Sequence, residues 1–132
     1  MAVTFTPDER TATRGDVIRR QKIAWTSNSA GAASGTVNLS GFLLRVTFVP
    51  GSGSDQPTNG YDVTLTDAGG IDILSGLGAN LSNTTANDTV PTVDTSDGTT
   101  TATTMRALAD TCTLSVTNAG DTKSGTIYLY LK

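Results

Sequence analysis

Hydrophobic and polar residues alternate with a period of two along much of the chain. In the segment 17–27, for example, Ile23 and Trp25 fall on the same side of an extended chain. Alternation of this kind is typical of a half-buried β-strand, in which successive side chains point to opposite faces. The pattern therefore predicts strands in four segments: 17–27, 61–66, 111–117 and 125–132.

The most hydrophobic part of the chain predicts two further strands, 36–39 and 42–49, separated by a turn or bulge at Ser40 and Gly41. Alternation from residue 42 onward places four large side chains on one face: Phe42, Leu44, Val46 and Phe48. The opposite face is also partly apolar, because it carries hydrophobic side chains beside Arg45. We expect such a strand to be buried on both faces or to contribute to an interface.

The segment 61–74 is predicted to be a β-hairpin in which 71–74 is the returning strand. The four residues between the strands, Asp-Ala-Gly-Gly, are types that favour a tight turn. Asp62 and Asp72 would lie on the two strands, and a pair of facing carboxylates is the arrangement that a hydrolase would need. Their threonine-rich, outward surroundings do not favour that chemistry.

Together these segments predict an all-β fold, an antiparallel β-sandwich of about seven to nine strands. A jelly-roll topology is expected, and an immunoglobulin-like topology is the alternative. One domain is expected over residues 17–132, preceded by an extended, basic N-terminal arm over residues 1–16. Residues 105–110 are compatible with a helical turn or with the start of a strand.

Composition supports this fold class and limits the surroundings in which the protein works. Charged residues make up 16% of the 132 residues, and threonine, which favours strands, is abundant. No apolar run is long enough to span a bilayer, and no secretion signal is recognisable at the N-terminus. A single cysteine cannot form an internal disulfide. We therefore expect synthesis in a cytoplasm and no membrane partner.

Residue types that usually perform catalysis or bind metals are scarce. The sequence contains no histidine and one cysteine, Cys112, so it lacks an imidazole base to activate a nucleophile and the usual ligands of zinc. Cys112 alternates with apolar residues and is expected to be buried. We therefore expect no catalytic residues, no metal site and no cofactor.

The distribution of charge points to a protein partner. The net charge is −3, but five of the nine basic residues lie within the first 22 positions. Two tyrosines near the C-terminus share the outward face of a strand, which fits either cross-strand packing or a partner interface. The candidate partner-binding residues are Arg10, Arg14, Arg19, Arg20, Lys22, Tyr128 and Tyr130. Direct nucleic-acid contact is not expected, because aromatic residues make up only 5% and the rest of the chain is acidic.

Several stretches, taken in order, resemble small virion structural proteins of tailed bacteriophages. They are KIAWTS, ASGT, FVPG, YDVTLTDAGGIDIL followed by GLGAN, and LSVTNAGDTKSGTIYLYLK. The chain is similar to capsid cement (decoration) proteins with a jelly-roll fold over residues 22–132. The resemblance implies a non-enzymatic protein that is made in the host cytoplasm. It also implies that a dimer or trimer binds the major capsid protein on the outer surface of the phage head.

Two alternatives remain open at this point. The protein could belong to another part of a virion, such as the base of a head fibre, the neck or the tail. A carbohydrate-binding β-sandwich is the second alternative, and it would need exposed aromatic side chains beside Asp and Asn. Trp25 and Tyr61 are the candidates for that role.

Overall fold

The computed structural model describes residues 3–10, 18–94, 101–103 and 106–132; of residues 4–10, 92–94, 101–103 and 110, only the backbone is described. Strands dominate this part of the chain, and the one helical element in it is a 3-10 helix, η1 (Gly53–Asp55). The strands are β1 (Val3–Arg10), β2 (Arg19–Thr26), β3 (Ala33–Pro50), β4 (Asp62–Thr66), β5 (Asn87–Thr89), β6 (Thr92–Asp94), β7 (Thr101–Thr103), β8 (Arg106–Thr117) and β9 (Ser124–Leu131).

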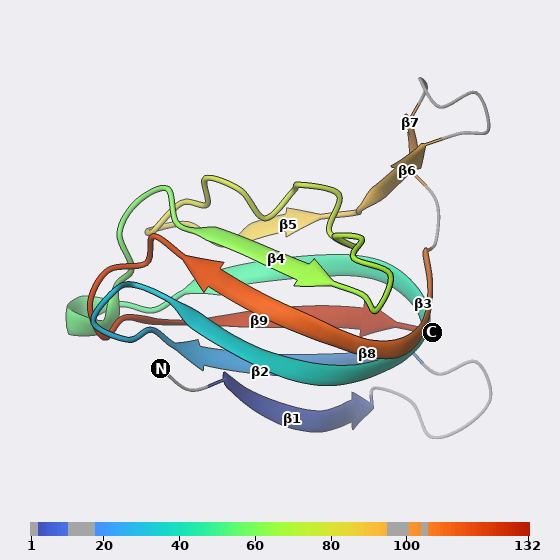
Figure 1. Ribbon diagram of the computed structural model, residues 1–132, viewed down its shortest axis with the longest axis horizontal. Coiled ribbons are helices and arrows are strands. Elements are labelled where there is room, and N and C mark those ends of the chain that lie inside the picture. Colours follow the sequence, from blue (N-terminus) through green and yellow to red (C-terminus); the bar gives the residue numbers. More distant parts are fainter. Residues whose placement is uncertain (1–2, 11–17, 95–100, 104–105) are drawn as a thin grey trace.

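Seven of these strands form one antiparallel sheet. Their order is β1-β2-β9-β3-β8-β4, and β5 pairs with the remaining edge of β3. β6 and β7 pair with each other in a small hairpin that projects from the rest of the molecule in Figure 1. The prediction of an all-β, antiparallel fold is confirmed.

The long strand β3 belongs to both halves of the sheet. Its first part, residues 33–43, pairs with β8, and its second part, residues 43–50, pairs with β9. Near the change of partner, Gly41 has φ +100°, and a Cβ atom there would lie 2.7 Å from the Lys132 carbonyl oxygen. The strand therefore needs glycine at this position. The sheet folds over here, so that β4 and β8 lie across from β2 and β9 in a sandwich-like arrangement (Figure 1).

We call the place near Gly41, where the sheet folds over, the corner of β3. The structure around this corner differs from the sequence prediction. One continuous strand replaces the two predicted strands, and the register shifts between Leu43 and Arg45. Leu43, Val46 and Phe48 are buried, whereas Phe42 is 46% exposed. The prediction that Phe42 shares one face of the strand with Val46 and Phe48 was wrong, because the irregularity inserts one residue and reverses the alternation.

The predicted hairpin at residues 61–74 forms only in part. The expected turn follows β4, and the Asp67 N–H donates to the Ile71 carbonyl at 2.9 Å. The predicted returning strand is reduced to one bridge between Thr66 and Asp72. The reason is that the Asp72 carboxylate accepts the N–H groups of Leu65 and Leu74, both at 3.1 Å, and draws the chain into a series of turns.

Residues 72–81, which we call the strap, then run along the outer edge of β4. The Val63 N–H donates to the Gly78 carbonyl at 2.7 Å, and the Leu81 N–H donates to the Tyr61 carbonyl at 2.8 Å. The strap also contributes buried side chains to the core, including Ile73 and Leu74. It thus closes a sheet edge that a second strand of the hairpin was expected to cover.

The expected N-terminal arm is described only in part. Its residues 3–10 form β1, which pairs with β2 and has a register shift between Thr6 and Glu9, around Pro7. Proline is tolerated at such an irregularity because it cannot donate a ladder hydrogen bond. Val3 packs against the core. The rest of the arm lies outside the described residues.

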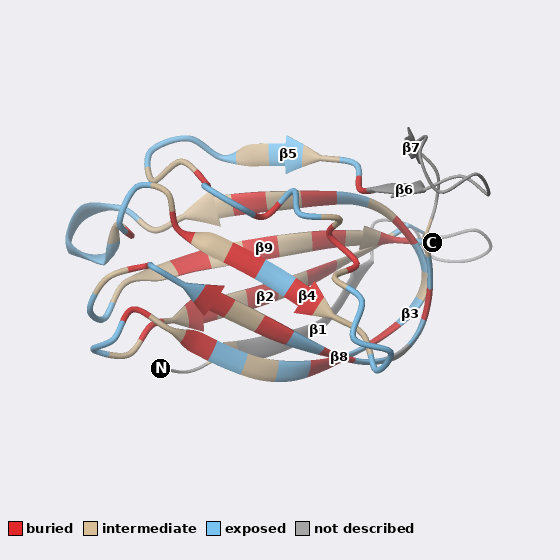
Figure 2. Cartoon of the chain, turned by 45° about the horizontal axis from the view of Figure 1, so that its top comes forward, coloured by how far each residue is buried: buried red, intermediate tan, exposed pale blue. Residues whose placement is uncertain are grey.

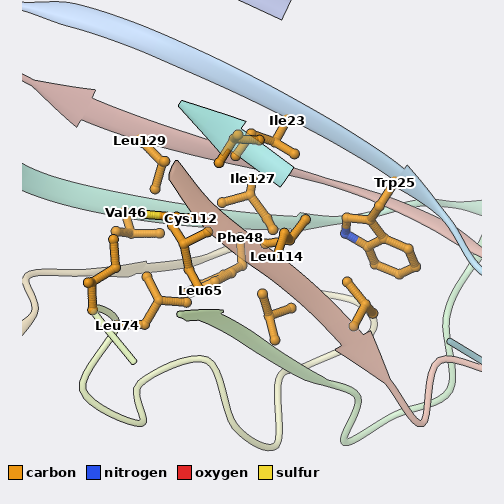
Figure 3. Close-up of a cluster of buried hydrophobic side chains, with 14 of the residues drawn as sticks. Ile23, Trp25, Val46, Phe48, Leu65, Leu74, Cys112, Leu114, Ile127 and Leu129 are labelled. Carbon is orange, nitrogen blue, oxygen red and sulfur yellow. The ribbon is translucent and has the colours of Figure 1, made fainter. Parts of the chain in front are cut away.

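One hydrophobic core fills the space between the two halves of the sheet. Buried and less buried residues alternate along β2 and β9, as the sequence predicts (Figure 2). Figure 3 shows Leu65 and Leu114 from one half packed towards Phe48 and Ile127 from the other. Cys112 is buried in this cluster, also as predicted. The core therefore fixes both halves, and with them the directions of the outward side chains.

Candidate functional site

Strand β9 lies between β2 and the second part of β3, and this order brings distant residues onto one outer face. The inward residues of β9 are buried, so the two tyrosines that alternate with them point outward and are half-buried. In register, Tyr130 lies opposite Arg20 on one side and Arg45 on the other. Tyr128 lies between Lys22 and Thr47 in the next row. We call these six residues, with Asp88 of the adjoining β5, the cationic–aromatic face.

Each tyrosine of this face carries an arginine over its ring. The guanidinium carbon of Arg20 lies 4.6 Å from the ring centroid of Tyr128, and that of Arg45 lies 4.4 Å from the ring centroid of Tyr130. A planar guanidinium is attracted to the negative face of an aromatic ring and stacks well on it. The two stacks hold long, otherwise mobile side chains in place before any partner arrives.

Asp88 adds one carboxylate at the edge of the face. Its Oδ1 accepts from the Arg45 Nε at 2.7 Å and from the Thr47 hydroxyl at 3.1 Å. The hydrogen bond from Arg45 lowers the pKa of Asp88 below its ordinary value, and the same bond raises the pKa of Arg45. Both side chains are about half exposed, with relative accessibilities of 47% for Arg45 and 56% for Asp88. The pair therefore remains within reach of a partner.

The predicted partner-binding residues do not all lie together. Four of the seven, Arg20, Lys22, Tyr128 and Tyr130, lie on the cationic–aromatic face. Arg19 alternates with Arg20, and its guanidinium donates to the Ser40 carbonyl near the corner of β3.

The other two predicted arginines belong to the expected arm. Arg10 ends β1 opposite Arg19, and only its backbone is described. Arg14 lies outside the described residues. The basic residues of the N-terminal region therefore include three, Arg19, Arg20 and Lys22, that belong to strand β2 and not to an arm.

Sequence reasoning missed three members of the site, Arg45, Thr47 and Asp88. Arg45 interrupts an apolar strand, which was a signal for an interface, but its partner tyrosine could not be named without the register. Asp88 lies in a polar stretch of Thr, Asn and Asp that gives no hint of a strand. Only the pairing of β5 with β3, with Asp88 opposite Thr47, brings it to the face.

The outer face of the other half of the sheet has a different chemistry. Its outward residues on β3, β8 and β4 form two rows of side-chain hydroxyls across the three strands. We call this set the hydroxyl face, and it consists of Ser34, Ser115 and Thr64 in one row and Thr36, Thr113 and Thr66 in the other. It carries no charge, and its residues are exposed or half-buried.

The aromatic residues considered for sugar binding belong to the core. Trp25 and Tyr61 are 2% and 1% exposed, and their rings pack against each other with centroids 5.5 Å apart. Burial raises the pKa of Tyr61 to about 12. Gly125 leaves room for the indole, because a Cβ atom there would lie 2.6 Å from a Trp25 ring carbon. The expectation that these two side chains could serve as exposed platforms was wrong.

The two aspartates considered for hydrolysis do not face each other. Asp62 lies opposite Thr117 at one end of β4, and Asp72 bridges to Thr66 at the other end. Asp62 accepts from the backbone N–H of Asn80 at 2.9 Å and from the side-chain amide of Asn118 at 2.6 Å. Asp72 accepts backbone N–H groups, as described above. Both carboxylates hold loops in place, which is a common use of Asp in turns.

Other features of the described residues give no further site. No group of three or more His, Cys, Asp or Glu side chains in this part of the chain is arranged to hold a metal ion. None of its helices has the length and apolar character needed to cross a membrane. Two surface hollows of about 210 and 380 Å³ are lined without a charged side chain. Pro50 and Gln56 contribute to the first, and Leu39 and Thr111 contribute to the second.

Comparison with known proteins does not assign the chain to a family. No protein-family model matches it, and no curated protein matches it. The cationic–aromatic face is therefore the feature from which function has to be argued.

Proposed function

We propose that this chain is a non-enzymatic structural protein of a phage virion, of the capsid decoration (cement) type. The cationic–aromatic face is the observation that carries the proposal. Arginine and tyrosine are enriched in protein interfaces and among the residues that contribute most to binding. Here two of each are held together on a rigid sheet, next to a lysine. The sequence resemblance to phage virion proteins supports the choice of partner.

The proposed partner is the major capsid protein, on the outside of the head. A protein that binds the assembled lattice but not the free subunits stabilises the assembled state by mass action. A dimer or trimer that engages several capsid subunits at once would bind more tightly than one copy. This role needs no cofactor and is compatible with synthesis in the host cytoplasm.

The proposal includes a jelly-roll topology for the sandwich. The feature that supports it is the pairing of β2 with the last strand, β9. In Greek-key arrangements, from which jelly rolls are built, a late strand returns to lie beside an early one. The corner in β3 allows one strand to serve both halves of such a sandwich.

The test is attachment to heads of the encoding phage that have been prepared without this protein. We expect the fluorescently labelled wild-type protein to sediment with the heads. Because the face supplies positive charge, Arg20→Gln combined with Lys22→Gln should weaken attachment at least about tenfold. The matched control, Thr36→Glu combined with Thr64→Glu, adds two negative charges to the hydroxyl face and should attach as the wild type does.

Three results would contradict the proposal. Failure of the wild-type protein to attach to any part of the particle would remove the virion role. Attachment confined to the neck or tail, seen by gold labelling of virions, would replace decoration by another structural role. Equal weakening by both double variants would show that the effect arises from overall charge and not from the cationic–aromatic face.

A further inference from the structure

The cationic–aromatic face carries a charge of opposite sign to the net charge of the whole chain. The chain has a net charge of −3, yet the described side chains of this face include three cations and one carboxylate. Pairing the face with itself in a symmetric dimer would place arginines and lysines of one copy against those of the other. Like charges juxtaposed in an interface disfavour association. The face therefore suits a partner with excess carboxylates better than a second copy of this chain.

The aromatic rings of the face favour a carboxylate ligand over a nucleic acid. Binding to single-stranded nucleic acid relies on aromatic faces on which bases stack. Here one face of each ring is already occupied, by Arg20 over Tyr128 and by Arg45 over Tyr130. Stacking leaves the N–H edge of a guanidinium able to donate: Arg45 lies over Tyr130 and still donates from Nε to Asp88. This edge matches the two oxygens of a carboxylate.

Asp88 shows how this face holds a carboxylate. One of its oxygens accepts from Arg45 and from the Thr47 hydroxyl, two donors that alternate along one strand. The carboxylate is about half exposed and lies on a three-residue strand, β5, at the edge of the sheet. It therefore occupies a place that the carboxylate of a partner could take.

We infer that the cationic–aromatic face binds an acidic segment of a partner protein, and that Asp88 competes with that segment for Arg45. The inference rests on the proposed function in so far as the partner would be the capsid protein. It adds the chemistry of the contact and an internal competitor. It has an unusual consequence, because removing Asp88 should strengthen binding beyond what the loss of one negative charge explains.

The test measures binding of the isolated protein to fluorescent poly-L-glutamate by anisotropy at low salt. We expect the wild-type protein to bind, and Arg20→Gln combined with Arg45→Gln to weaken binding at least about tenfold. Asp88→Asn should tighten binding about two- to fivefold. The matched control is Asp121→Asn, because Asp121 is an exposed aspartate on a loop and its loss changes the overall charge equally.

The outcomes separate this inference from the proposed function. If Asp88→Asn tightens binding no more than Asp121→Asn, Asp88 is not a competitor. If circular dichroism shows that Asp88→Asn perturbs the fold, Asp88→Thr, which also removes the carboxylate and suits a strand, should tighten binding instead. Tighter binding of an oligo-dT strand than of poly-L-glutamate would overturn the carboxylate assignment. Attachment to heads without any binding of poly-L-glutamate would overturn the inference and leave the proposed function standing.

Discussion

The two outer faces of this protein share a strand and a core but present opposite chemistry. The first part of β3 contributes Ser34 and Thr36 to the hydroxyl face, and the second part contributes Arg45 and Thr47 to the cationic–aromatic face. The inward residues of both parts are similar hydrophobic side chains in one cluster. The shared inward pattern therefore determines the fold, while the outward residues can differ between the two faces without disturbing the core.

Each kind of outward residue has a physical consequence. Threonine and serine hydroxyls satisfy strand propensity, are well hydrated and offer a partner little apolar surface or charge. Stacked arginine and tyrosine side chains offer planar apolar area together with charge. Since the stacks are already formed, less side-chain entropy is lost when a partner binds. The cationic–aromatic face is therefore the better candidate for binding, and the hydroxyl face is the better internal control.

The largest expected effect is a loss of folding stability, caused by a substitution at the corner of β3, where the two faces meet. Gly41→Ala should lower the free energy of unfolding by about 2–4 kcal/mol, because it combines a strained φ with a clash against the Lys132 carbonyl. Gly53→Ala is the matched control, since Gly53 has φ +62° but open space around it, and should lose only about 1 kcal/mol. Urea unfolding measures both, and equal losses would show that the corner is not tightly packed.

A smaller effect is expected when side chains are truncated on one face at a time. Tyr128→Ala combined with Tyr130→Ala should weaken attachment to heads at least about tenfold, because the arginines lose the rings that order them. Thr36→Ala combined with Thr113→Ala should change attachment less than about twofold. Sedimentation with heads measures both variants, and a larger loss for the threonine pair would reverse the comparison of the two faces.

The smallest expected effect is a loss of folding stability at low pH, and it should arise from Asp88 on the cationic–aromatic face. The pKa of Asp88 is lower in the folded protein than its ordinary value of 3.8, so the unfolded chain takes up its proton first as the pH falls. The contribution of Asp88 to stability is therefore present above a pH of about 4 and is lost below it. Asp88→Asn should make the urea midpoint less sensitive to pH in this range. An unchanged pH dependence would show that the pair with Arg45 contributes nothing to folding.

Strands with regular alternation could be predicted from the sequence, and the structure confirms them. Ile23 and Trp25 in β2, and Ile127 and Leu129 in β9, are buried as their spacing indicates. The rule succeeds there because each strand keeps one face on the core along its length. The outward direction of Tyr128 follows from the same rule.

Features that depend on pairing partners could not be predicted in the same way. The shift at Leu43 that turns Phe42 outward depends on which strand lies beside β3, and alternation in a single segment carries no such information. The returning strand of the predicted hairpin was lost to hydrogen bonds of Asp72, a residue that sequence alone placed on a strand surface. Likewise, Arg45 and Asp88 join the candidate site through register.

The strap along β4 has a consequence for how many copies of this protein could be crowded together. Exposed sheet edges are templates for strand addition, and they promote aggregation between identical chains. Peptide groups of Tyr61, Val63 and Leu65 at this edge are already bonded by residues of the strap. A neighbouring copy thus cannot add a strand at this edge unless the strap first detaches from β4. Copies packed densely on a shared surface would therefore keep separate sheets.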